Sequence, residues 1–395
     1  MSVVAQTRRY VRNDPKKREP ILTIDVSLIV AILALVGLGL VMVASASLSI
    51  AEAQTGNAYY YLVRQACLLL AAVVAAYICF MLPLSIWERM APWLLIAALI
   101  SLFLVLVPGV GVTVNGARRW IDLVVIRLQP SEFAKLAFLI YLAGYLKHHQ
   151  SMLENAMHGF IKPLAVFSLF ACLLLLEPDF GSVVVLAIAA FGMMFLAGVK
   201  LYQFLILILL GGTSLGALAY FSPYRLQRLT TFLDPWQDPF NTGFQLVQAL
   251  IAFGRGSWFG VGLGESVQKL SFLPEAHTDF LFAVMAEELG LFSVFIVIAL
   301  FGFIVLRCFY IANQCARLSM VFHAYLSYGI ALMMGMQAFI NIGVNMGVLP
   351  TKGLTLPLMS YGGSSILVTS ICCALLLRAD YEMRQAKNKE MQRRW

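Results

Sequence analysis

The sequence predicts an all-α polytopic membrane protein with about ten transmembrane helices and both termini in the cytoplasm. Of its 395 residues, 61% are hydrophobic and only 12% are charged, whereas an ordinary soluble domain has about 25% charged residues. The mean hydropathy is +0.85, and the apolar residues form long runs that no soluble core could use. Such a run satisfies its backbone hydrogen bonds in lipid by forming a helix.

Windows of about 20 apolar residues define ten predicted spans. They divide the chain into a basic tail at 1–23, a membrane domain at 24–380 and a second basic tail at 381–395. The fifth and sixth spans are separated only by Glu177-Pro178-Asp179, which predicts a tight hairpin. The spans cover residues 24–47, 61–82, 91–108, 131–147, 162–177, 180–198, 201–221, 279–306, 319–346 and 361–379.

Basic residues predict the orientation, because Lys and Arg concentrate on the cytoplasmic side of membrane proteins. They cluster before the first span and after the last one, so both tails face the cytoplasm and the number of spans is even. Two long segments, about 109–130 and 222–278, then lie on the outer side, where chemistry is expected. This topology explains most of the formal charge of +8, so the tails are expected to contact anionic lipid and no nucleic-acid binding is predicted.

The first span and the cysteines are both interpreted as structural. Ala44-Ser45-Ala46 resembles a signal-peptidase site, but the apolar stretch before it is too long for a signal peptide and follows a long polar tail. We therefore expect an uncleaved signal anchor. The seven cysteines have no CxxC spacing and lie mostly in apolar stretches, which favours core thiols over disulfides or a metal site.

The large outer loop at 222–278 contains turn signals and a glycine-rich run. Its two Asp-Pro pairs predict turns, and residues 245–253 are predicted to form a short helix lying on the membrane. The glycines of 253–264 do not match the GxxxxGK(S/T) pattern, so a P-loop is rejected. We expect these glycines to let the backbone pass close to lipid or to another helix.

Asp279 stands where this polar loop meets a long apolar helix, in the stretch LPEAHTDFLFAVMAEELG from Leu273 to Gly290. A carboxylate costs roughly 3 kcal/mol at membrane depth, which indicates a function. The alternative is that Thr278 caps the helix and Asp279 complements the positive end of its dipole. His277 has no second histidine at metal spacing, so a zinc site is not predicted.

Cations crowd the outer side around the start of the fourth span, against the usual trend. Arg118, Arg119 and Arg127 precede the span, and Lys135 lies one turn into it. Two structural interpretations remain open for Lys135. It could form a local ion pair with Glu132 at i, i+3, or its long side chain could extend outward to the membrane surface.

Lys352 is a single cation in a loop between two apolar spans. Prolines flank it at 350 and 357, and a Tyr-Gly-Gly-Ser-Ser turn opens the next span. It is either an anchor to lipid headgroups or a ligand for an anion, and the rigid loop favours the second role.

Three further acids have structural interpretations. Asp179 is well placed as the N-cap of the sixth span. Glu287 and Glu288 lie at least two turns inside the eighth span, where a buried acid needs a partner, so we expect a structural polar contact for both.

The outer face therefore combines one carboxylate at a helix mouth with several fixed cations. This combination is typical of group transfer from a lipid-linked pyrophosphate. The cations would hold the diphosphate and offset the charge of the leaving group, while the acid would take a proton from the attacking hydroxyl.

The same stretches resemble motifs of the SEDS family (shape, elongation, division and sporulation). They read RLQPSEFAKL, EPDFG, FLDPWQDPFNTGFQ, FGRGSWFGVGLGES, LPEAHTDF and LPTKGLTLPLMSYGGSS, and they extend over essentially the whole membrane domain. The TKGLT sequence at 351–355 and the basic amino-terminal tail resemble the division members of the family rather than the elongation members.

The resemblance implies a peptidoglycan glycosyltransferase of the bacterial inner membrane that polymerises lipid II for the septal cell wall. It would work at the division septum with a class B penicillin-binding protein, which is a transpeptidase, and with other divisome membrane proteins. Asp279 matches the essential aspartate of the family and would be the general base. Arg127, Lys135 and Lys352 match cavity positions expected to bind pyrophosphate, with Glu132 and Asp179 as further cavity members.

The α-linked donor and the β-1,4 product of such a transfer imply a single displacement with inversion. No cofactor is certain, although the pyrophosphates would suit Mg²⁺ or Mn²⁺. Two other functions compete with polymerisation. One is a lipid II flippase, and the other is a non-catalytic scaffold for division proteins.

Overall fold

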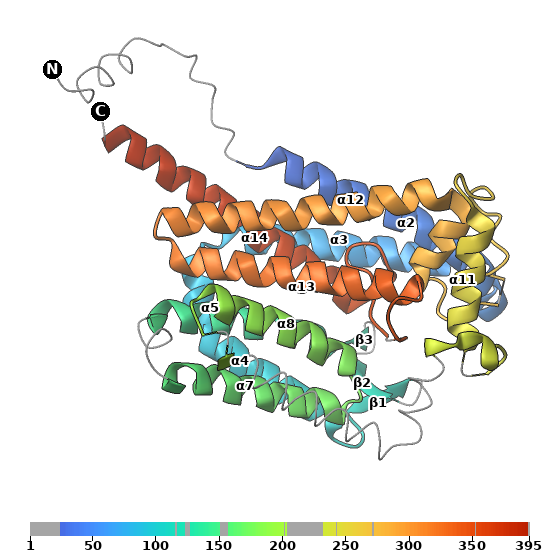
Figure 1. Ribbon diagram of the computed structural model, residues 1–395, viewed down its shortest axis with the longest axis horizontal. Coiled ribbons are helices and arrows are strands. Elements are labelled where there is room, and N and C mark those ends of the chain that lie inside the picture. Colours follow the sequence, from blue (N-terminus) through green and yellow to red (C-terminus); the bar gives the residue numbers. More distant parts are fainter. Residues whose placement is uncertain are drawn as a thin grey trace, which may run out of the picture.

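The computed structural model is a bundle of long helices whose outer end carries the smaller elements. It describes residues 24–114, 117–122, 127–150, 157–200, 202–203, 232–241, 243–270, 272–351 and 353–393. Lys352, the tail at 1–23 and nearly all of the predicted span 201–221 lie outside the described residues. Figure 1 shows α11 (Phe244–Gly256), a small β-sheet and the loop after α13 at one end of the bundle, which we call the outer end.

Each of the nine other predicted spans is found as a long helix, and seven of the described helices are long and apolar enough to cross a membrane. The helices are α2 (Val26–Thr55), α3 (Tyr60–Met81), α4 (Leu84–Leu106), α5 (Pro130–His148), α7 (Met157–Leu176), α8 (Phe180–Leu196), α12 (Leu281–Arg317), α13 (Val321–Asn345) and α14 (Gly363–Arg393).

Several boundaries differ from the prediction. Helix α12 continues to Arg317, and α14 continues through most of the segment expected to be a separate tail at 381–395. The extension of α14 contains two ion pairs at i, i+4, Arg378–Glu382 at 2.6 Å and Asp380–Arg384 at 2.7 Å. Pairs with this spacing stabilise a helix.

The interior of the bundle is built around α13. In its most apolar stretch 72% of the residues are buried, against 17% for α3. Helix α13 packs on α5, α8, α12 and α14, whereas α3 and α4 expose large apolar side chains such as Leu70 and Trp93. Polar side chains on α13 must therefore find their partners inside the protein.

The first outer segment forms a three-stranded antiparallel sheet that the sequence analysis did not predict. Strand β2 (Ala117–Asp122) pairs with β1 (Gly111–Val114) and with β3 (Arg127–Leu128). The sheet places Arg118 and Arg119 on its central strand at the outer end of the bundle.

The glycine-rich run packs backbone to backbone against a break in α12. Gly290 interrupts that helix with φ 73°, and a Cβ on Gly260 would lie 2.1 Å from the carbonyl oxygen of Glu288. The predicted close approach of the glycines to another helix is confirmed. Four backbone hydrogen bonds join the segments: Leu291 N to Ser257 O (2.9 Å), Phe292 N to Trp258 O (3.2 Å), Val261 N to Glu287 O (3.0 Å) and Gly262 N to Glu288 O (3.1 Å).

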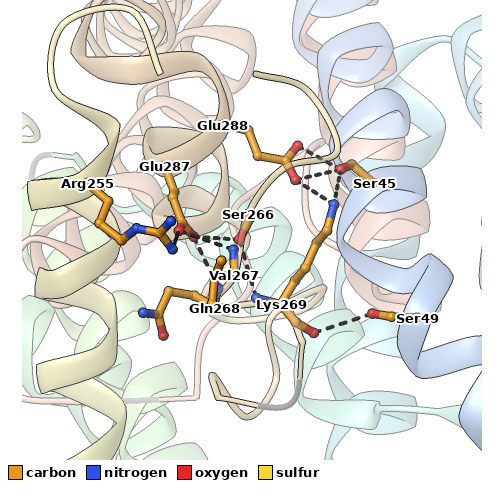
Figure 2. A network of polar contacts seen from close by, with 9 residues as sticks. All are labelled: Ser45, Ser49, Arg255, Ser266, Val267, Gln268, Lys269, Glu287 and Glu288. Atoms are coloured by element: carbon orange, nitrogen blue, oxygen red, sulfur yellow. Dashed lines mark hydrogen bonds and ion pairs between the residues drawn. The ribbon is translucent and has the colours of Figure 1, made fainter. Parts of the chain in front are cut away.

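Glu287 and Glu288 secure the chain that follows this run, as Figure 2 shows. Both carboxylates are fully buried, and the predicted structural contact is confirmed for each. Removing one partner of such a buried pair typically costs about 3–5 kcal/mol, so this network fixes the loop that leads to Asp279. The partners are Arg255, Ser266 and the N–H groups of Val267 and Gln268 around Glu287, with Ser45 and Lys269 around Glu288.

The break in α12 predicts an unequal response to two glycine substitutions in one helix. Gly290→Ala should destabilise the protein by roughly 2 kcal/mol or more, because it adds a Cβ at positive φ and 2.3 Å from the nitrogen of Gly260. Gly302→Ala is the matched control, since a Cβ there meets nothing within 4 Å. Thermal unfolding of both purified variants checks the difference, and equal melting temperatures would contradict it.

Candidate active site

Asp279 lies at the outer end, and its backbone is held by α13. Its carbonyl oxygen accepts hydrogen bonds from the side-chain amides of Asn341 at 2.9 Å and Asn345 at 3.0 Å. The half-buried side chain makes no cap, because the N-cap of α12 is Phe280 and has no side-chain cap bond. Thr278 donates instead to Glu275, so the capping interpretation is wrong.

Arg119 on β2 faces the Asp279 carboxylate, and the sequence analysis did not assign it to the site. Its Nη1 lies 3.8 Å from the position of a Cβ on Gly353, and Oδ2 of Asp279 lies 3.3 Å from the same point. Its Nε donates to the carbonyl of Glu177 at 3.1 Å, and Nη2 donates to that of Pro178. These carbonyls fix the guanidinium, and Nη1 lies beside Gly353 together with the Asp279 carboxylate.

The hairpin between α7 and α8 contributes two acids to the same region. Asp179 caps α8 as predicted, since it accepts from the backbone N–H of Ser182 at 3.3 Å and from its hydroxyl at 2.7 Å. Glu177 is fully buried, and neither of its carboxylate oxygens has a hydrogen-bond partner among the described residues.

Burial and nearby acids raise the pKa values of both Glu177 and Asp279. Burial, with the charge of Asp179, raises the pKa of Glu177 to about 8 in spite of Arg119. Burial also raises the pKa of Asp279 to about 7, where Glu275 and Asp179 add to the shift and Arg119 opposes it. A carboxylate with a pKa near neutrality is suited to general base catalysis.

Lys135 and Glu132 lie inside the bundle. The Nζ of Lys135 donates to Oε1 of Glu132 at 2.9 Å and to Oε1 of Gln337 at 3.1 Å. The side chain of Lys135 is 0% exposed, so the local ion pair is confirmed and the outward extension is wrong. Whether either residue acts on a substrate stays a prediction.

Arg127 and the Lys352 loop occupy more open positions. Arg127 on β3 has a side chain that is 55% exposed, with its Nε 3.5 Å from Oδ2 of Asp122. Lys352 lies outside the described residues, but its neighbour Gly353 lies against Asp279. The structure therefore brings Asp279, Arg119 and the loop that contains Lys352 together.

Metal binding was also left open by the sequence. In the described part of the chain, no group of three or more His, Cys, Asp or Glu side chains is arranged to hold a metal ion. The divalent cation, Mg²⁺ or Mn²⁺, stays a prediction.

Comparison with known proteins gives concordant matches along the chain. The profile of the cell cycle protein family, which takes in FtsW, RodA and SpoVE, matches residues 26–385. A protein of Nitrosococcus halophilus named "Probable peptidoglycan glycosyltransferase FtsW" is 56% identical over 363 residues, which is 92% of this chain and 94% of that protein.

Two solved structures share the fold. One is a chain from work on the structural coordination of polymerization and crosslinking by a peptidoglycan synthase complex. It has a TM-score of 0.76 and 31% identity, with 92% of this chain and 99% of that chain covered. The other is the rod shape determining protein RodA of Thermus thermophilus, with a TM-score of 0.68, 30% identity and coverage of 91% and 97%.

Because Glu177 is a buried acid, its replacement by glutamine is expected to stabilise the protein by an amount that depends on pH. The folded protein keeps the proton of Glu177 up to a pKa of about 8, while the unfolded chain loses it near pH 4.5, so native stability falls as pH rises through this window. Glu177→Gln removes that loss, which can reach about 1.4 kcal/mol per pH unit. The variant should therefore melt progressively above the native protein between pH 5 and 8.

The exposed acid Glu265 provides the control. Glu265→Gln should give a constant difference in melting temperature from the native protein across the same pH range. A constant difference for Glu177→Gln as well would show that Glu177 is ionised in the folded protein at neutral pH.

Proposed function

The chain belongs to the cell cycle protein family of FtsW, RodA and SpoVE, and we propose that it polymerises lipid II with Asp279 as the general base. It is a multi-pass membrane protein and a peptidoglycan glycosyltransferase by its relationship to proteins of that name. The observation that supports the catalytic assignment is the Asp279 carboxylate, with a pKa near 7, facing Arg119 at the outer end of the bundle.

The transfer is a single displacement at the anomeric carbon of the donor. The 4-hydroxyl of the acceptor sugar forms a bond to donor C1 while the bond from C1 to the diphosphate oxygen breaks. The hydroxyl proton passes to Asp279, and undecaprenyl pyrophosphate leaves with the electron pair. Attack opposite to the α-linked leaving group produces the β-1,4 linkage by inversion. A positioned base of this kind contributes about 10²- to 10⁴-fold to a rate.

The diphosphate requires cations that are already in place. Arg119 is fixed by two backbone carbonyls and offers Nη1 near Asp279, so it can bind an anion with little loss of side-chain freedom. Lys352 would bind from the adjoining loop, and the exposed Arg127 would bind at the rim. Asp179 contributes its negative charge, which favours the protonated form of Asp279.

A crosslinking partner and a septal location extend this proposal. A class B penicillin-binding protein would crosslink the strands that this chain makes, at the division septum and among other divisome membrane proteins. Support for such a partner comes from the similarity to a chain of a peptidoglycan synthase complex that coordinates polymerization and crosslinking.

Asp279→Asn should bind labelled lipid II normally and polymerise it about 10²- to 10⁴-fold more slowly, because the amide cannot accept the hydroxyl proton. The assay uses purified full-length protein with and without the transpeptidase partner, and Glu265→Gln is the control. Normal polymerisation by Asp279→Asn would exclude the catalytic role. If Asp279→Asn lost the transbilayer movement of lipid II but kept polymerisation, the flippase would be favoured. If the native chain made no product with or without the transpeptidase partner, the scaffold would be favoured.

The polymerisation rate should rise with pH through about 7, because Asp279 acts in its ionised form and its pKa lies there. Glu275, Asp179 and Arg119 are the charged groups that act on it. Arg119→Gln removes the cation that lowers this pKa, so the acid limb of the rate profile should move to higher pH, while Arg119→Lys should restore it in part. An unshifted acid limb in Arg119→Gln would show that Arg119 has no influence on the base.

A further inference from the structure

Three buried amide side chains form a stripe along α13. Gln337, Asn341 and Asn345 are spaced four residues apart, which places them on one face of the helix. They are 4%, 2% and 0% exposed in a helix that is otherwise mostly apolar. A buried amide is costly without partners, so the groups that these side chains bind indicate what the stripe does. We call the three side chains the amide ladder.

The amide ladder joins the two segments of the candidate active site. The Nδ2 of Asn341 donates to the carbonyls of both Asp279, at 2.9 Å, and Leu354, at 2.6 Å. Asn345 adds a second bond to Asp279 at 3.0 Å, and Gln337 donates to the carbonyl of Thr355 at 3.2 Å. All these acceptors are backbone carbonyls, so the bonds fix the chain and leave the carboxylate of Asp279 free.

Gln337, the first residue of the ladder, contacts a buried ion pair. Lys135 of α5 donates to Oε1 of Gln337 and is paired with Glu132, and its side chain is fully buried. To reach a substrate diphosphate, the ammonium of Lys135 would have to leave both partners. Glu132 would then be left as a buried charge without its ion pair. Breaking a buried pair in this way is strongly unfavourable.

We propose that the amide ladder holds the general base and the segment at Leu354 and Thr355 at a fixed separation, and that Lys135 is a positioning residue acting through Gln337. This inference rests on the proposed function and changes the predicted role of Lys135 from pyrophosphate ligand to anchor. The ladder thereby sets the distance between the backbone of the general base and the backbone at Leu354 and Thr355.

The first experiment removes the central amide. Asn341→Ala in the full-length protein should lower kcat about 10- to 100-fold, as expected for lost alignment, with the KM for lipid II within about threefold of the native value. Hydrogen exchange of the peptide 353–360 should become faster at the same time. Asn341→Ser keeps a small polar donor at this position and should show the same changes to a lesser degree, so it serves if Asn341→Ala folds poorly.

Two controls separate this inference from the proposed function. Asn313→Ala removes an amide from α12 that accepts a bond from Tyr328 away from the candidate site, and it should change neither kcat nor exchange at 353–360. Asp279→Asn should slow turnover about 10²- to 10⁴-fold without altering that exchange. Unchanged kcat and exchange in both Asn341 variants would overturn the ladder alone, while an active Asp279→Asn would overturn the catalytic assignment.

The second experiment tests Lys135 directly. Lys135→Met should lower kcat and speed exchange at 353–360 while leaving the KM for lipid II within about threefold. Lys135→Met should also lower the melting temperature, because it leaves Glu132 buried without its partner. The double variant Lys135→Met, Glu132→Gln removes this acid as well. It should recover at least half of the decrease in melting temperature, with KM still unchanged. A rise in KM of about tenfold or more in both variants, with native exchange at 353–360, would show that Lys135 binds the substrate and would overturn the positioning role.

Discussion

The site depends on the carbonyl oxygen of Asp279, which two amides of α13 hold at the outer end of the bundle. Because most of α13 is buried, the side-chain amides of Gln337, Asn341 and Asn345 cannot be satisfied by water. These amides donate instead to the backbone carbonyls of Asp279, Leu354 and Thr355, in segments that converge on the site. These buried amide hydrogen bonds therefore form the framework that places an acid at the outer end of the bundle.

The chain that precedes Asp279 is also held by α12. The glycine-rich run lies against the break at Gly290, where only glycines permit such close contact between backbones, and Glu287 and Glu288 bind the residues that follow. The loop that contains the HTDF sequence is thus held between α12 and α13. Neither set of contacts uses the carboxylate, which remains available for chemistry.

The sequence was sufficient for features that depend on local composition. Hydropathy predicted the nine described spans, and the cap at Asp179, the close approach of the glycines and the structural role of Glu287 and Glu288 followed from residue type and position. Arg119 was missed as a site residue because its placement depends on a strand pairing that the apolar pattern does not reveal. The choice between the two structural interpretations of Lys135 depended on its burial in the bundle, which the local sequence does not give. The four-residue spacing of Gln337, Asn341 and Asn345 was a readable signal in an apolar helix, and it was overlooked.

Helix α14 has a geometric consequence beyond the site. It begins at Gly363, where the hydroxyl of Ser364 accepts a hydrogen bond from the backbone N–H of Gln129, and it runs without interruption to Arg393. At 1.5 Å per residue its 31 residues extend about 46 Å, whereas the hydrocarbon core of a bilayer is about 30 Å thick. The carboxyl-terminal part of α14 therefore extends beyond the bilayer at the end opposite the candidate site, and the continuous helix connects that end to the outer end of the bundle.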